Sequence, residues 1–194
     1  MKKIVTVLSI FIILMGCAKE QQQVDYTEVS FTVNRSLLSN EYISKEAEIS
    51  FSPPINWKPI SPQLLSSIKE NVKASKDTAD VAILPLNVFM DMESSFTCFL
   101  SIFNSSSRAE QTITYYLNEL RTSNENYQTN EGSFSHNGFD FHQLIFTKDE
   151  LITIKLIATN SEDKIFMIDY ILPAKAYENE LRSIESSIGT IKEI

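Results

Sequence analysis

Glycine is scarce in this sequence, with four residues among 194. The phosphate-binding motifs GxGxxG and GxxxxGK[ST] need several glycines at fixed spacings, and neither can be assembled here. Basic residues are also few, 17 against 25 acidic ones, which leaves a formal net charge of -8. Because binding to a nucleic-acid backbone depends on clustered Lys and Arg, we expect no nucleic-acid partner.

Residues that commonly carry catalysis or bind metals are sparse as well. The two histidines, His136 and His142, flank an Asn-Gly pair, and neither belongs to an HExxH motif or has further ligands at a metal-binding spacing. Asp140 and His142 would share one face of a strand and could form an acid–imidazole pair, but a solvated hairpin rim is the favoured interpretation. No GxSxG motif accompanies the serines. We therefore predict no enzyme, no metal site and no cofactor.

The N-terminus has the layout of a secretory signal peptide. Lys2 and Lys3 precede a short apolar run over residues 4–16, which contains no charged residue. As a helix this run would span about 20 Å, which is short of the ~30 Å hydrocarbon core of a membrane. A buried helix at a protein surface would need a polar face, and this run has none. We interpret residues 1–16 as a signal peptide.

The end of the apolar run and the cysteine after it, Leu14-Met15-Gly16-Cys17, resemble the lipobox of bacterial lipoprotein precursors. Met15 is less usual at its position than Ala or Ser. The resemblance implies diacylglyceryl attachment to Cys17, cleavage before it and acylation of the new N-terminus. Several acyl chains, palmitate among them, would anchor the protein firmly in a membrane. A plain secreted protein, in which Cys17 is incidental, is the alternative.

Processing would leave an acidic protein on a short polar tether. Loss of Lys2 and Lys3 takes the formal net charge from -8 to -10, so anionic lipid headgroups would repel the protein and the lipid alone would hold it. Residues 17–25 form the predicted tether, and residues 26–194 a single domain. Ala18 provides no acidic retention signal, which favours the periplasmic side of the outer membrane in a cell with two membranes. Cys98 would be the one remaining thiol, most simply a small buried hydrophobe.

Hydrophobic periodicity predicts an α+β fold. We expect strands over residues 46–52, 80–90, 95–103, 127–136, 139–147, 150–159 and 164–172, and helices beginning at residue 61 and over 108–121 and 173–188. Residues 26–33 could form a first strand or belong to the tether. Asn137-Gly138 is the preferred pair for a two-residue hairpin turn, and Gly189 is placed to end the last helix. Strands 150–159 and 164–172 are apolar on both faces, which indicates an antiparallel β-sheet covered by helices on both faces, an α/β/α sandwich.

Three sequence features together resemble the PsbP/Mog1/DcrB-like α/β/α sandwiches. They are a strand ending in Phe51-Ser52-Pro53-Pro54, a tryptophan at Trp57 and a closing segment Ser187-Ile188-Gly189-Thr190-Ile191. The resemblance covers residues 46–192, although Asn56 replaces the usual glycine before the tryptophan. Asn also adopts left-handed backbone angles. The group includes photosystem assembly subunits, a nuclear-transport GTPase partner and bacterial lipoproteins, so the resemblance implies a non-enzymatic binding or assembly role.

Five residues are candidates for a partner or ligand surface: Trp57, Pro85, Phe89, His142 and Asp169. Asp169 lies in the middle of an apolar strand, where Lys155 would pair with it across strands, and a structural ion pair is favoured over a ligand site. Trp57 could stack on a ligand, but such a residue more often closes one end of a core. Pro85 should confine residues 84–90 to a sheet edge, which would make this run an exposed docking edge.

The leading functional hypothesis is a membrane-anchored, non-catalytic lipoprotein of the cell envelope that binds a protein partner. The alternative is a small-ligand carrier or sensor with a cavity between sheet and helices, suggested by the twelve phenylalanines. An enzyme that uses Asp169 or His142 is a third, weaker possibility. The sequence identifies neither the partner nor the ligand.

Overall fold

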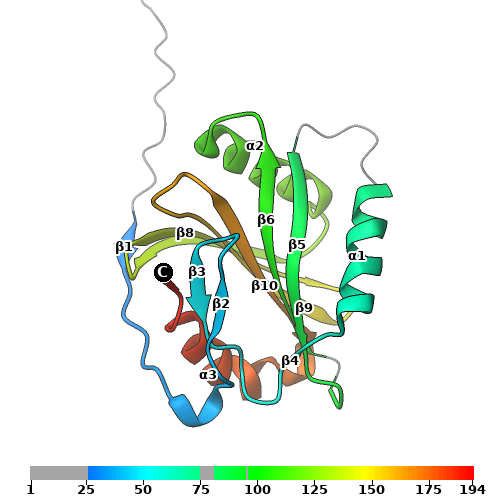
Figure 1. The fold of residues 1–194 in the computed structure, drawn as a ribbon, viewed down its shortest axis with the longest axis vertical. Coiled ribbons are helices and arrows are strands. Elements are labelled where there is room, and N and C mark those ends of the chain that lie inside the picture. Colours follow the sequence, from blue (N-terminus) through cyan, green and yellow to red (C-terminus); the bar gives the residue numbers. More distant parts are fainter. Residues whose placement is uncertain (1–25, 75–80, 95) are drawn as a thin grey trace, which may run out of the picture.

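A computed structural model describes residues 26–74, 81–94 and 96–194. The predicted signal peptide, Cys17 and the tether lie outside these residues. At the centre of the fold is an eight-stranded sheet with the order β1-β7-β8-β9-β10-β6-β5-β4 (Figure 1). All neighbouring strands are antiparallel except β1 and β7, which are parallel. The strands are β1 (Thr27–Glu28), β4 (Lys58–Pro59), β5 (Val81–Met90), β6 (Thr97–Ser105), β7 (Thr129–His136), β8 (Phe139–Lys148), β9 (Leu151–Thr159) and β10 (Ile165–Pro173).

Local turn chemistry sets the register of the central strands. Asn137 and Gly138 join β7 to β8 with φ angles of 48° and 84°. A type I′ turn needs both central residues in this left-handed region, so the predicted hairpin is confirmed. The predicted strands over 139–147 and 150–159 leave residues 148–149 for the next turn, but it lies one residue later, at Asp149 and Glu150, with φ angles of 49° and 64°. β8 therefore extends through Lys148.

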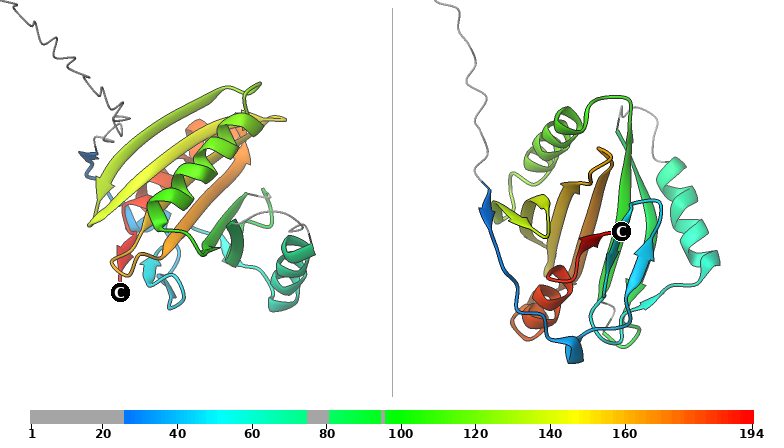
Figure 2. Two further views of the ribbon diagram at one scale, coloured as in Figure 1. Left: turned by 90° about the horizontal axis from the view of Figure 1, so that it is seen from above. Right: turned by 60° about the vertical axis from the view of Figure 1, so that its left-hand side comes forward.

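Two clusters of buried apolar residues lie on opposite faces of the sheet, because alternate residues of β9 and β10 belong to different clusters. One face is covered by α3 (Tyr177–Ile188) and by a second sheet with the order β11-β3-β2. Its strands are β2 (Tyr42–Ser44), β3 (Ile49–Phe51) and β11 (Lys192–Glu193). The other face is covered by α2 (Ala109–Ser123), through Ile113 and Leu117. Figure 2 gives two further views of these layers, and the predicted α+β class with helices on both faces is confirmed.

All members of both clusters lie between Val29 and Ile191. The packing of the described sheet thus needs no residue from the predicted signal peptide or tether. We therefore expect residues 26–194 to fold without the segment that precedes them.

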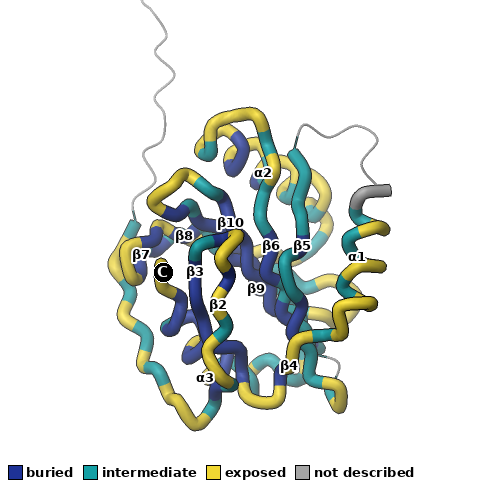
Figure 3. The backbone as a smooth tube through the Cα atoms, viewed as in Figure 1, coloured by how far each residue is buried: buried dark blue, intermediate teal, exposed yellow. Residues whose placement is uncertain are grey.

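The helix α1 (Pro62–Ala74) runs beside β5 and is loosely packed (Figure 3). The Leu64 N–H donates to Ser61 Oγ at 3.3 Å, and Pro62 occupies the first helical position, so Ser61 caps the helix that was predicted to begin at residue 61. Its apolar side chains are only partly covered, since Leu64 is 48% exposed. None of the α1 residues whose burial is described is fully buried.

Residues 29–34, here called the N-terminal strap, continue from β1 past the end of α3 (Figure 1). The sequence suggested a strand over 26–33, but only Thr27–Glu28 pairs as β1. The strap is held instead by single hydrogen bonds: the Val29 N–H donates to Ser135 O at 2.9 Å, and the Asn34 N–H donates to Ser186 Oγ at 3.2 Å.

Gly189 follows α3 as predicted, but for a different physical reason. Its φ angle is -61°, which any residue can adopt, so no left-handed cap is formed. A Cβ atom at this position would lie 2.7 Å from Phe31 Cβ and 2.8 Å from Val33 Cγ2. The glycine is therefore needed for the close approach of the N-terminal strap to the end of α3.

Candidate functional site

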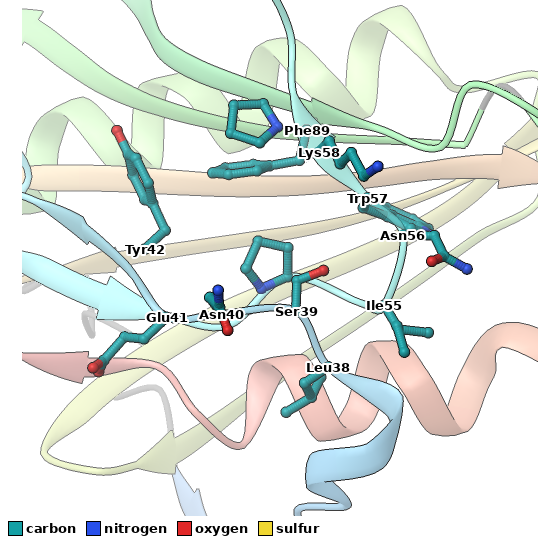
Figure 4. Close-up of a pocket in the computed structure, with 12 residues that line it drawn as sticks. Leu38, Ser39, Asn40, Glu41, Tyr42, Ile55, Asn56, Trp57, Lys58 and Phe89 are labelled. Atoms are coloured by element: carbon teal, nitrogen blue, oxygen red, sulfur yellow. The ribbon is translucent and has the colours of Figure 1, made fainter.

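A groove of about 480 Å³ lies between the second sheet and the edge of the central sheet (Figure 4). It brings together two of the sequence candidates, Trp57 and Phe89. Trp57 comes from the loop before β4, and Phe89 comes from β5. We call it the aromatic groove. Its lining residues are Leu38, Ser39, Asn40, Glu41, Tyr42, Pro53, Ile55, Asn56, Trp57, Lys58, Pro59 and Phe89.

The loop over residues 53–59 builds one wall of the groove by crossing from the second sheet to the central one. Near its start, the Ile55 N–H donates to Leu37 O at 2.8 Å, at the end of a short 3-10 helix (Arg35–Leu37). Asn56 then reverses the chain with a φ of 71°, as its place in the family pattern predicted. On the central sheet, the Ile60 N–H donates to Val88 O at 2.9 Å. Fixed at both ends, the loop holds Trp57 in a defined position.

Trp57 serves mainly as core. It is 2% exposed, and its ring lies 6.1 Å from Phe96 and 6.2 Å from Tyr170 between centroids, so its face is not available for stacking on a ligand. Its indole N–H has no hydrogen-bond acceptor within the described part of the chain. No fully buried side-chain nitrogen or oxygen of the described residues lacks a partner. The indole N–H is therefore not fully buried, and Trp57 lines the groove.

The floor of the groove is aromatic, and its rim is polar. Phe89 is 2% exposed and packs edge-to-face against Tyr42, with 5.0 Å between ring centroids. Ile55 is 48% exposed at the rim, where Asn40 and Asn56 are also exposed. An apolar floor beside side-chain amides suits a polypeptide segment that inserts an apolar side chain and hydrogen-bonds through its backbone.

Two strand edges border the groove. β2 is the last strand of the second sheet and β4 the last strand of the central sheet in the described topology. Edge strands present backbone N–H and C=O groups that can pair with a further strand. Extended peptides bind other domains in this way. The geometry of the groove therefore fits an extended segment.

The sequence analysis missed Tyr42, Pro53 and Ile55 as members of this groove. Pro53-Pro54 shortly before Trp57 was a usable signal, because two prolines mark a loop and Ile55 is an apolar residue within it. Tyr42 gave no such signal, since it reaches Phe89 only through the pairing of β2 with β3.

Asp169 and Lys155 form the ion pair that the sequence favoured, on the sheet face covered by α2. Lys155 Nζ lies 2.8 and 2.7 Å from the two carboxylate oxygens, 3.2 Å from Met167 Sδ and 5.7 Å from the centroid of the Tyr116 ring. Both residues are buried, at 6% and 8% exposure, and neither lines the aromatic groove. Each carboxylate oxygen of Asp169 is thus bound by Lys155.

Burial raises the pKa of Asp169, and the charge and hydrogen bonds of Lys155 offset only part of this effect. Burial alone would lower the pKa of Lys155. The Asp169 carboxylate and the Tyr116 hydroxyl reverse that effect, and the pKa of Lys155 is raised. Lys155 is therefore held in its charged form, and its charge compensates that of Asp169.

His142 does not pair with Asp140. The Tyr26 hydroxyl lies 2.8 Å from His142 Nε2, while the Asp140 carboxylate accepts a hydrogen bond from Ser135 Oγ. Burial lowers the pKa of His142, helped by the charge of Arg121 and opposed by Asp140. His142 thus fixes the beginning of the described chain to β8 rather than forming an acid–base site.

Two further sequence expectations need correction. His136 was placed on a solvated hairpin rim but is buried, with Nδ1 at 2.9 Å from Val29 O and Nε2 at 3.2 Å from Gly189 O. It thereby joins the N-terminal strap to the end of α3. Pro85 was expected on an exposed docking edge but is also buried. It pairs opposite Ser101 next to a β-bulge, and of residues 84–90 Phe89 is the one that lines the aromatic groove.

Within residues 26–74, 81–94 and 96–194, the acidic, histidine and cysteine side chains form no group of three or more that could hold a metal ion. The same residues include no helix with both the length and the apolar character of a membrane span. Cys98 is a free, fully buried thiol. Burial raises its pKa well above the ordinary value, which keeps it protonated and unreactive.

The fold is thus an α+β sandwich in which helices cover both faces of an antiparallel sheet. The sequence matches no protein-family model and no curated protein. Among solved structures, the fold is similar to PsbP (CyanoP) of Synechocystis sp. PCC 6803, a protein of the group that the sequence resembles, with 12% identity, a TM-score of 0.49, and coverage of 86% of this chain and 98% of that one. It is also similar to LpqN of Mycobacterium tuberculosis, described as involved in cell envelope biogenesis, with 10% identity, a TM-score of 0.48, and coverage of 84% and 97%. At these identities the similarity concerns the fold alone.

Proposed function

We propose that this protein is a lipid-anchored, non-catalytic module of the cell envelope that binds a protein partner in the aromatic groove. The observation that carries the proposal is the groove itself, an apolar floor of Tyr42, Pro53 and Phe89 with a rim of side-chain amides and two strand edges. Its charged lining residues are Glu41 and Lys58, and Glu41 is already bound to Lys192 at 3.0 Å and to Ser50 at 3.0 Å. Such an arrangement favours recognition over a chemical reaction.

The partner would contribute an extended segment with one large apolar side chain. This side chain would occupy the space between Tyr42, Pro53 and Phe89, where burial contributes roughly 1.5–3 kcal/mol for a side chain such as Leu or Phe. A backbone carbonyl of the segment would accept the indole N–H of Trp57, and the amides of Asn40 and Asn56 would bind neighbouring backbone groups. A short apolar anchor surrounded by polar contacts is the usual plan of a protein interface.

The partner should be lost when the rim of the groove is made charged. We expect Ile55→Arg to reduce recovery of a stoichiometric partner from native envelope extract at least tenfold, because the guanidinium would face the apolar anchor. The recovery is measured by pull-down with residues 18–194, followed by quantitative mass spectrometry. Leu64→Arg is the matched control, since Leu64 is also 48% exposed but lies on α1. Equal losses with both variants, or no captured partner under crosslinked conditions, would contradict a binding site in the groove.

The lipid anchor has its own test. We expect the protein purified from the envelope to begin at Cys17 and to carry the mass of three acyl chains, as measured by intact mass spectrometry. Cys17→Ser should abolish both the cleavage before residue 17 and the added mass. Cys98→Ser should change neither, because Cys98 is fully buried. A product that retains Met1, or one without hydrocarbon chains, would refute the anchor.

Carriage of a small ligand is a second candidate function, because one specific observation favours it. A cavity of about 310 Å³ lies between α3, the central sheet and the N-terminal strap. It shares no lining residue with the aromatic groove. Ligand pockets in proteins have volumes from about 300 Å³ upward and are mainly apolar with few polar groups, and this cavity meets both criteria.

A further inference from the structure

The cavity beneath the N-terminal strap, here called the α3 cavity, is walled by apolar side chains that the fold leaves incompletely covered. Phe134, Ile154 and Ile184 form its buried base. Phe31 from the strap and Leu181 from α3 are only half-buried at its opening. Apolar surface that is held open by a rigid sheet and helix gains free energy when an apolar molecule covers it.

One polar group interrupts this apolar wall. Along β8 the residues Phe139, Phe141, Gln143 and Ile145 point to the face covered by α3, and Gln143 is the only amide among them. It is half-buried, and its side chain has no hydrogen-bond partner within the described residues. An amide offers both a donor and an acceptor. It would therefore orient a ligand that carries one hydroxyl or amide group.

The wall is also missing a side chain opposite Gln143. Gly132 of β7 pairs with Gln143 in the sheet register, and paired residues present their side chains on the same face. A Cβ atom added at Gly132 would have no heavy atom within 4 Å. The absent side chain leaves open space next to Gln143, although Gly132 itself does not line the cavity.

From this geometry we propose that the α3 cavity binds a neutral, slender amphiphile of about ten non-hydrogen atoms, with its hydroxyl or amide group on Gln143. The size follows from the volume of about 310 Å³ and a share of ~30 Å³ for each water-sized atom. The apolar part of the ligand would lie against Ile184 and Leu181. The proposal rests on the second candidate function and is independent of the aromatic groove.

Electrostatics select against an anionic head group. Glu185 is the one charged residue among the described residues that line the cavity. Arg182 lies beside the adjoining hollow between the strap and α3 and does not line the α3 cavity. The formal net charge of -8 adds a repulsive background. A carboxylate ligand would therefore bind more weakly than an alcohol of equal length.

The proposal is tested by thermal unfolding of residues 18–194 with 1-decanol and with decanoate as probes. We expect 1-decanol to raise Tm saturably and to bind at least fivefold more tightly than decanoate. Leu181→Trp should abolish saturable binding by filling the cavity, and Ile145→Trp should do the same from the opposite wall if Leu181→Trp does not fold. Gln143→Leu should weaken 1-decanol binding about threefold or more, whereas Gln111→Leu on α2, at an exposed position, should not.

Three results would overturn this assignment: no saturable response to 1-decanol, a response of the Leu181→Trp or Ile145→Trp variant equal to that of the unmodified chain, or equal affinities for the alcohol and the carboxylate. The groove variant Ile55→Arg should bind 1-decanol as the unmodified chain does. A failure of the α3 cavity proposal and a failure of the protein-binding proposal are therefore separable.

Discussion

We expect Lys155→Met to lower the free energy of unfolding by about 3–5 kcal/mol, the largest effect of any single substitution considered for this protein. The substitution leaves the Asp169 carboxylate buried without its partner, and removal of one member of a buried ion pair costs about this much. Met retains most of the apolar volume of Lys, so the loss reports the uncompensated charge rather than a cavity. Chemical denaturation followed by circular dichroism measures the change.

The double variant Lys155→Met/Asp169→Leu separates the charge effect from packing. Replacement of both partners by apolar residues of similar volume is often neutral or stabilising. We therefore expect the double variant to recover most of the stability lost in Lys155→Met. Two results would contradict a buried ion pair between Lys155 and Asp169. One is a Lys155→Met variant about as stable as the unmodified chain, and the other is a double variant less stable than Lys155→Met.

Gly189→Ala should also destabilise the protein, by about 1–3 kcal/mol, which is the typical cost of overpacking. The new Cβ would lie 2.7 Å from Phe31 Cβ and 2.8 Å from Val33 Cγ2, so the N-terminal strap has to move away from α3. That movement would also lengthen the contact between His136 Nε2 and Gly189 O, which is 3.2 Å in the structure. The change is measured as a lower denaturation midpoint.

Gly132→Ala is the control for this prediction. Gly132 lies within β7, and a Cβ there meets no heavy atom within 4 Å. Replacement of Gly by Ala at such a compatible position is expected to be neutral or to stabilise by about 0.4–1 kcal/mol. A loss in Gly132→Ala as large as that in Gly189→Ala would show that glycine flexibility, and not the close approach of the strap, explains the effect.

The elements of the sheet were predictable because their signals are local. Alternating and doubly apolar runs located β7 to β10, and Asn137-Gly138 located the turn between β7 and β8. The pairing of Asp169 with Lys155 was also predictable, since short connections fix β9 and β10 as antiparallel neighbours and a charge in an apolar strand needs a partner. In each case the deciding residues are close in the sequence.

The aromatic groove could be predicted only in part. Trp57 and Phe89 were identified individually, but Tyr42 and Ile55 join them only when the second sheet docks against the central one. The burial of His136 and the close approach at Gly189 were missed for the same reason. Both depend on the N-terminal strap, which lies more than a hundred residues earlier in the chain. Local periodicity carries no information about such long-range contacts.

The two faces of the sheet have different roles in this account. The face under α2 holds the Lys155–Asp169 pair within a closed apolar cluster and offers no access to it. The face under α3 and the second sheet contains the α3 cavity and borders the aromatic groove. Recognition is thus assigned to the side on which the packing between layers is incomplete.

The most direct test of a partner in the aromatic groove is site-specific photocrosslinking in intact cells. A photoreactive residue in place of Ile55 should give one discrete, stoichiometric adduct with a second protein. The same probe in place of Tyr115, which is also 48% exposed but lies on α2, should give none. No adduct from position 55, or the same adduct from both positions, would contradict the proposed function.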